Sequence, residues 1–263
     1  MDGQGTRSTR VATSGLLAVA LLVAGCSSGG SSSPAASSPT EASPPSTTSS
    51  PTSESSELQG CVPACVSGSV SPGEVGPGPY QTQYFFGGQM RVTFTGAWTS
   101  SEDSTGEFKA APRATPQNAV FFWEDVYPVR HGNRVEGVPL TAAGLLQWLQ
   151  STPALKTSAP SKGRIGKLPA TLVDVSVSDK AKNEDPNCPT RACVLFLGFP
   201  QWTGDWGIAY TQVQRFYLSD VEYGGVKHLF VAVIYPDKSP DLKTFAKVGE
   251  LLLRTVRVPA TPA

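Results

Sequence analysis

The chain of 263 residues carries 21 lysines and arginines against 21 aspartates and glutamates, so its formal net charge at pH 7 is zero. Nucleic-acid binding calls for a basic stripe or patch, and this even balance argues against that function. About 200 residues remain from Leu58 onward, enough for one domain with a sizeable core.

The N-terminus has the pattern of an export signal. Arg7 and Arg10 precede an apolar run over residues 11–25, and its length of about 15 residues is below the roughly 20 that a membrane-spanning helix needs. The run ends in Val23-Ala24-Gly25-Cys26, which resembles the lipobox of bacterial lipoproteins. In that group the signal peptide is removed just before the cysteine, whose thiol then carries acyl chains such as palmitate. The resemblance implies a signal peptide over 1–25 and a lipid on Cys26; an ordinary signal peptide is the alternative.

Residues 26–57 have the composition of a tether. Between Ser27 and Glu57 there are 14 Ser, 4 Thr and 5 Pro in 31 residues, and nothing is more apolar than alanine. Such a segment cannot bury enough surface to offset its ordering entropy, so we expect it to be disordered. Together the lipid and the tether would hold the rest of the chain at the extracytoplasmic face of the cell membrane.

The cysteine count agrees with export. Assigning Cys26 to a lipid leaves four of the five cysteines, in two close pairs: Cys61 with Cys65, and Cys188 with Cys193. Outside the cytosol such pairs favour disulfides, and local pairing is our preference among the three connectivities that four cysteines allow. The alternative is a four-cysteine zinc site, whose usual spacing these pairs fit only loosely. We therefore expect no metal and no other cofactor.

The remaining sequence predicts strands with two helices. Alternating or continuous apolar runs predict strands over 81–86, 90–95, 119–123, 171–177, 194–197, 214–223 and 227–235. The last of these is an almost continuous apolar run, typical of a central strand buried on both faces. Gly224-Gly225 predicts a hairpin between it and the strand before it.

One helix is predicted from Thr141 to near Ser151, because Pro153 follows. A second is predicted to have its N-cap at Ser239 and Pro240 as its first residue, with an apolar stripe of Leu242, Phe245, Ala246, Gly249, Leu252 and Leu253. On its wet side Glu250 can meet Arg254. The expected fold is α+β: one globular domain over 58–263, with an antiparallel sheet of about six or seven strands flanked by helices.

A family resemblance adds to this reading. The strand Arg91-Val92-Thr93-Phe94 leads through Gly96-Ala97 to Trp98, and a capped terminal helix runs into Thr255-Val256-Arg257-Val258. These motifs resemble the actinobacterial surface lipoproteins with a PsbP-like α-β-α domain, over most of residues 80–258. That group usually has Pro-x-Gly-Trp at the turn where this chain has Gly-Ala-Trp. The resemblance implies a binding or accessory role, since the group shares no catalytic site that could be transferred.

No catalytic residue is expected from the sequence. His131 lies in a predicted turn, and His228 opens the buried strand, where a satisfied histidine is commoner than a general base. No serine-hydrolase elbow, zinc-protease motif or P-loop is present. Glu124 and Asp125 would point to opposite faces of a strand, and we expect them to be surface charges.

One aromatic patch, Gly198 to Gly207 with Tyr210 beyond it, suggests a ligand site. Loop-borne Trp202, Trp206 and Tyr210 could contact a ligand that Asp205 and Gln201 orient, or the rings could cap the end of the sheet. We therefore expect a non-enzymatic lipoprotein that binds a small, lipidic or glycan ligand of the cell envelope. The alternatives are a module that docks on another envelope protein without a ligand pocket, and an envelope hydrolase of unfamiliar type.

Overall fold

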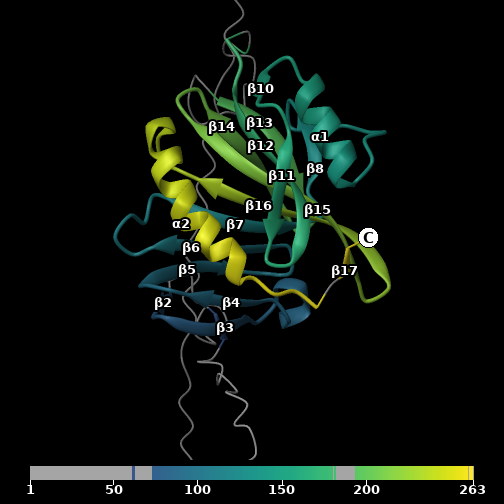
Figure 1. Ribbon diagram of the computed structural model, residues 1–263. Helices are drawn as coiled ribbons and strands as arrows, with labels where there is room; N and C mark the ends of the chain where they lie inside the picture. The colour runs from purple at the N-terminus through teal and green to yellow at the C-terminus, as the bar shows by residue number, and fades with distance from the viewer. Residues whose placement is uncertain (1–60, 63–72, 180, 182–192, 260, 263) are drawn as a thin grey trace, which may run out of the picture. The chain divides into compact units, whose positions relative to one another are not determined.

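The computed structural model describes residues 61–62, 73–179, 181, 193–259 and 261–262, all of which belong to one compact unit, Ser53–Ala263 (Figure 1). The predicted signal peptide, Cys26 and the tether lie outside the described residues, as do Cys65 and Cys188. Within the described part the fold is rich in β-structure, with two α-helices.

The centre of the fold is a large antiparallel sheet. Eight of its ten strands form a continuous path, and β11 (Ser161–Ile165) and β17 (Thr261–Pro262) pair at the side with β12 and β15. The antiparallel arrangement is confirmed, but the expected six or seven strands are too few, because short strands with half-exposed polar residues have no apolar run to reveal them. The path runs β10 (Leu155–Thr157), β12 (Leu168–Val177), β15 (Val213–Tyr223), β16 (Val226–Tyr235), β7 (Ala119–Glu124), β6 (Glu107–Pro112), β5 (Trp98–Asp103) and β2 (Gly73–Val75).

Two smaller sheets accompany it. One contains β1 (Cys61–Val62), β3 (Gly78–Thr82) and β4 (Arg91–Phe94), with β1 parallel to β3. The other has the order β14 (Trp202–Ala209), β13 (Cys193–Phe199), β8 (Tyr127–Arg130) and β9 (Asn133–Arg134). Residues 202–209 were expected in a loop, and that expectation is wrong: β14 pairs antiparallel with β13.

Strand β16 is central, as its sequence predicts. It pairs with β15 on one side and with β7 on the other, and the residues from Leu229 to Ile234 are buried. The hairpin at Gly224-Gly225 is also confirmed, since Tyr223 faces Val226 and both glycines have positive φ, 60° and 77°. Two successive residues in this conformation match the twist of the flanking strands, and glycine adopts it without strain.

Both predicted helices are present. Helix α1 (Ala142–Ser151) has Thr141 as its N-cap, with the hydroxyl oxygen accepting the Gly144 N–H at 3.0 Å. Helix α2 (Leu242–Thr255) starts later than predicted, because Ser239–Asp241 forms a 3-10 turn and Asp241 occupies the cap position. Its predicted apolar stripe is buried throughout.

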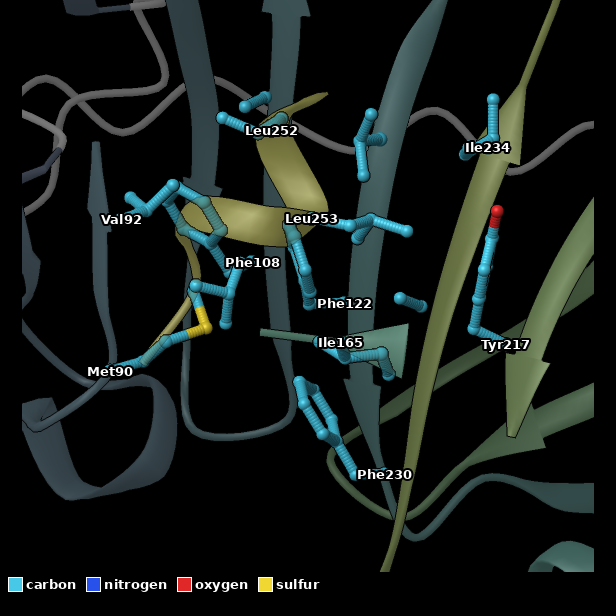
Figure 2. Close-up of a cluster of buried hydrophobic side chains, with 14 of the residues drawn as sticks. Met90, Val92, Phe108, Phe122, Ile165, Tyr217, Phe230, Ile234, Leu252 and Leu253 are labelled. Atoms are coloured by element: carbon cyan, nitrogen blue, oxygen red, sulfur yellow. The ribbon is translucent and has the colours of Figure 1, made fainter. Parts of the chain in front are cut away.

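The large sheet is covered on both faces, which gives two hydrophobic cores. Helix α2 and strand β4 close one core, whose labelled side chains in Figure 2 include Met90, Phe122 and Leu253. Helix α1 and strands β13 and β14 close the other. Alternate residues of β7 supply both: Phe122 faces the first core and Trp123 the second. Because successive side chains of a strand point to opposite faces of the sheet, the apolar run of β7 contributes to both cores.

The predicted strand 81–86 is wrong in its second half. Strand β3 ends at Thr82, and Phe85–Gly88 form a 3-10 turn in which Phe86 has a φ of 52°. The carboxylate of Asp103 accepts the backbone N–H groups of Tyr84 and Phe85 at 3.2 and 3.0 Å. This buried acceptor replaces the sheet partners that an extended chain would need.

Candidate functional site

The predicted aromatic patch is built around Trp206, which lies against the second core. Its ring centroid is 4.7 Å from that of Phe121, 4.8 Å from that of Trp123 and 5.5 Å from that of Tyr235. Its indole N–H donates to Oε1 of the buried Gln214 at 2.9 Å. The faces and edges of the indole ring contact other aromatic rings, and its N–H is hydrogen-bonded within the protein. This is the arrangement that the sheet-capping interpretation requires.

The other residues of the patch point elsewhere. Asp205 and Trp206 are neighbours on β14 and face opposite sides of the strand. Tyr210, in the turn after β14, is 48% exposed and its hydroxyl donates to Oδ1 of Asp179 at 3.2 Å. The side chain of Trp202 is outside what the structure describes. None of Asp205, Trp206 and Tyr210 lines the hollows described below, so the structure does not gather them around a cavity.

A cavity of about 240 Å³ lies instead between α1 and the sheet formed by β8 and β13. Its walls come from four segments: the end of β8, the end of α1 with the turn that follows, Ala181, and the start of β13. Most of the wall is apolar, with Trp148, Ala181 and Phe196 buried and Ala154 and Leu195 half-buried. Among the described residues of the lining there is no acidic side chain.

Two aromatic rings give the cavity a rigid wall. The Trp148 and Phe196 rings are nearly parallel, at an interplanar angle of 14° and a centroid separation of 6.5 Å. The hydroxyl of Thr152 donates to the Trp148 carbonyl oxygen at 2.8 Å and fixes the last turn of α1. The buried indole nitrogen of Trp148 has no hydrogen-bond partner among the described residues. A ring held in this way presents a preformed apolar surface.

The mouth of the cavity carries the guanidinium group of Arg130 and, beside it, the imidazole of His131. Arg130 and His131 are both exposed and line it. They lie where β8 turns into β9, and His131 and Gly132 have positive φ values of 52° and 74°. The turn predicted at His131 is confirmed. This turn places both residues at the mouth of the cavity, beside its apolar wall.

No local pattern in the sequence indicated this cavity as a unit. Trp148 was predicted only as part of a helix, and His131 only as a solvated turn residue. Trp148 lies on α1 and His131 lies in the turn after β8, and these two segments are not adjacent along the chain. They line one cavity because α1 packs against β13, where Trp148 contacts Phe196. A large aromatic residue near the end of α1, Trp148, was the signal that could have pointed to the cavity. The rest of the buried face of α1 is made of smaller apolar residues.

The two acids predicted to be surface charges converge on His228, so that prediction is wrong. Oδ2 of Asp125 lies 2.8 Å from Nδ1 of His228, and Oε1 of Glu124 lies 3.9 Å from the same atom. Strand β7 ends at Glu124, and Asp125 has a φ of 52°, so the two side chains no longer alternate. The other Asp125 oxygen accepts the Leu229 N–H at 2.9 Å. His228 thus has a partner, and the cluster ties the end of β7 to the start of β16.

Burial raises the pKa of Glu124 to about 7, because the carboxylate loses solvent; the charge of His228 acts in the opposite direction. Burial also raises the pKa of Glu107 to about 7, and the nearby charge of Glu102 adds to the rise. Glu107 lies with Glu102 and Gln201 at a separate, open hollow. Burial therefore brings the pKa values of Glu107 and Glu124 close to neutral pH.

The cysteines are described only in part. Cys193 lies at the edge of the cavity and is disulfide-bonded. The side chains of the other three predicted partners are outside the described residues, so pairing with Cys188, and of Cys61 with Cys65, stays a prediction. In the part of the chain that the structure describes, no group of three or more His, Cys, Asp or Glu side chains could hold a metal ion.

No protein-family model matches the chain, and no curated protein proved similar to it. None of the helices formed by the described residues is long and apolar enough to cross a bilayer. The observations that bear on function are therefore the geometry of the cavity and the sequence around Cys26.

Proposed function

We propose that the protein is a cell-envelope lipoprotein, anchored by a lipid on Cys26 at the extracytoplasmic face of the membrane, whose domain binds a small apolar ligand without catalysis. A large antiparallel sheet with one helix over each face supports the resemblance to the PsbP-like lipoproteins. In this proposal the tether positions the domain, and the cavity between α1 and β13 is the binding site.

The observation that carries the proposal is the apolar cavity itself. At about 240 Å³ it is slightly smaller than the roughly 300–1000 Å³ of sites for drug-sized molecules. That size suits a short acyl chain or a single ring better than a glycan, whose hydroxyl groups would find few partners on this wall. The Arg130 guanidinium at the mouth favours a ligand that ends in a carboxylate or another anion.

The alternative of a docking module has less support. The exposed large apolar residues in the described part of the chain are Tyr84, Leu140, Tyr210, Val226, Val248 and Leu251. Val248 and Leu251 are neighbours on one face of α2, and the other four lie in loops and at a hairpin; a single pair of exposed apolar side chains is common on the surface of a domain. A protein partner would use a contiguous patch.

Ligand binding in the cavity predicts a clear response to octanoate, which has a short acyl chain and a carboxylate. In the chain from position 26 with Cys26→Ala, octanoate should shift the Trp148 indole resonance in NMR spectra. Ala154→Phe puts a ring into the cavity and should weaken binding at least about ten-fold. Ala159→Phe, at an exposed position outside the cavity, is the matched control and should leave the affinity unchanged.

The mouth can be tested separately with 1-octanol, which lacks the charge. Arg130→Gln should weaken octanoate binding about three-fold and leave octanol binding unchanged, because an exposed charge pair contributes little. Equal octanoate binding by the parent chain and Ala154→Phe would contradict the proposed site.

The lipid anchor predicts a change of cell fraction. With Cys26→Ala, the protein made in its own host should leave the membrane fraction for the soluble extracytoplasmic fraction, since no acyl chain remains to partition into the bilayer. Fractionation followed by immunoblotting measures this. A Cys26→Ala protein that stays fully in the membrane fraction would refute the anchor.

A further inference from the structure

A second hollow, of about 400 Å³, lies on the other face of the large sheet from the cavity. It is bounded by α2 and by the hairpin of β11 and β12, which run beside each other in Figure 1. The Gly166 N–H at the hairpin turn donates to the carbonyl oxygen of Leu253 at 2.7 Å and holds the hairpin against the end of α2. Figure 2 shows Ile165 of this hairpin in the same core as Leu253 and Tyr217.

Among the described residues that line the hollow, the acid Glu250 is already engaged. Oε1 of Glu250 accepts hydrogen bonds from the Arg215 guanidinium and from the Tyr217 hydroxyl, each at 3.0 Å. Arg215 also holds Asp174 through two bonds of 2.8 and 3.1 Å. Burial and the charge of Glu250 raise the pKa of Tyr217, so its hydroxyl keeps its proton and continues to donate. The Glu250 carboxylate therefore has Arg215 and Tyr217 as its hydrogen-bond partners.

This use of Glu250 leaves three cations at the hollow without an acid. The sequence suggested that Glu250 meets Arg254 one turn along α2, but it forms its ion pair with Arg215 instead. Lys162 and Arg164, on β11, are exposed like Arg254. In the described part of the chain none of the three forms an ion pair. Like charges gathered at one site repel each other unless an anion compensates them.

We propose that this hollow is a second binding site, specific for a phosphate ester. Its rim offers two guanidinium groups and an ammonium group, and guanidinium groups bind phosphate oxygens in pairs. Leu172 and Leu253 supply an apolar wall for the organic part of the ester. The same chemistry occurs in a free sugar or glycerol phosphate and in a phospholipid headgroup. The site needs neither the lipid anchor nor the first cavity.

The experiment uses the chain from position 26 with Cys26→Ala and two probes. Glycerol 3-phosphate is titrated by calorimetry, and vesicles of equal parts phosphatidylglycerol and phosphatidylcholine are tested by co-sedimentation against pure phosphatidylcholine. The triple variant Lys162→Gln, Arg164→Gln, Arg254→Gln should weaken binding at least about 20-fold, since each cation contributes a factor of several toward an anionic surface. The matched control Lys156→Gln, Lys227→Gln, Lys238→Gln removes three exposed charges elsewhere and should change binding less than about three-fold.

The outcomes separate the sources of the phosphate. Calorimetric binding of glycerol phosphate that the triple variant loses supports a free ester, and vesicle binding alone that the triple variant loses supports a headgroup. Binding to neither probe, or equal losses in the triple variant and its control, overturns the site. Arg164→Gln alone should give an intermediate loss, so the test does not depend on one variant. Octanoate binding should be unaffected by the triple variant, which separates this proposal from the one on the first cavity.

Discussion

Replacing Glu107 and Glu124 together by glutamine is expected to stabilise the protein at pH 8 and to flatten the dependence of its stability on pH. Burial raises both pKa values from an ordinary 4.5 to about 7 in the folded state. An acid whose pKa is higher when folded holds its proton more tightly in the folded state. The stability it contributes is therefore complete below about pH 4.5 and is lost as the pH rises through about 7.

The size of the effect follows from the shift. A rise of about 2.5 pKa units corresponds to roughly 3 kcal/mol for each group once both states are ionised. Glu107 and Glu124 are only 9% and 8% exposed, so little of this is screened by solvent. We expect the double variant to gain about 6 kcal/mol at pH 8, or roughly 15 °C in Tm, and to gain little at pH 4.

Thermal unfolding between pH 4 and pH 9 measures this difference. Glu102→Gln is the matched control, because Glu102 is an exposed acid beside Glu107 and should not gain stability to a comparable degree. Parallel pH profiles for the parent chain and the double variant would show that the two carboxyl groups are not buried acids in solution.

The elements that sequence reasoning found are those with a strong local signal. Strand β16 has an apolar run, the β15–β16 hairpin has two glycines, and α2 has an apolar stripe of the right period. Each signal is contained within one segment, so pairing elsewhere in the chain cannot change it. Strands such as β5 and β14 were missed because β5 carries polar residues and β14 carries glycines and aromatics that are typical of loops. Their extended form depends on the strands beside them.

The candidate sites were harder to predict because each depends on one backbone detail. Asp125 turns toward His228 only because its φ is positive, and no local pattern announces that. Glu250 faces Arg215 because β15 passes under α2, and this contact alone leaves Arg254 without its expected partner. The contacts of Asp125 with His228 and of Glu250 with Arg215 are tertiary contacts between residues far apart in the chain. A sequence pattern indicates which groups are present, and only the packing decides which of them meet.

Trp206→Ala is expected to cost about 3 to 4 kcal/mol of stability, or roughly 10 °C in Tm. The indole ring packs against Phe121, Trp123 and Tyr235, and deleting it leaves a cavity at the edge of the second core. Oε1 of Gln214, a residue with no exposed surface, would also lose its indole donor, which adds about 1 kcal/mol. Thermal or denaturant unfolding measures the loss.

Two further variants identify its source. Trp206→Phe keeps a ring against the same neighbours but removes the donor, so it should recover about half of the loss. Tyr210→Ala, from the same predicted patch, deletes an exposed ring and should change stability by less than about 0.5 kcal/mol. If Trp206→Ala were as stable as the parent chain, the ring would not be capping the sheet, and a role in ligand contact would regain support. A large loss in Trp206→Ala and none in Tyr210→Ala would mean that the aromatic run contains one structural residue and one surface residue, although the sequence presents them as a single patch.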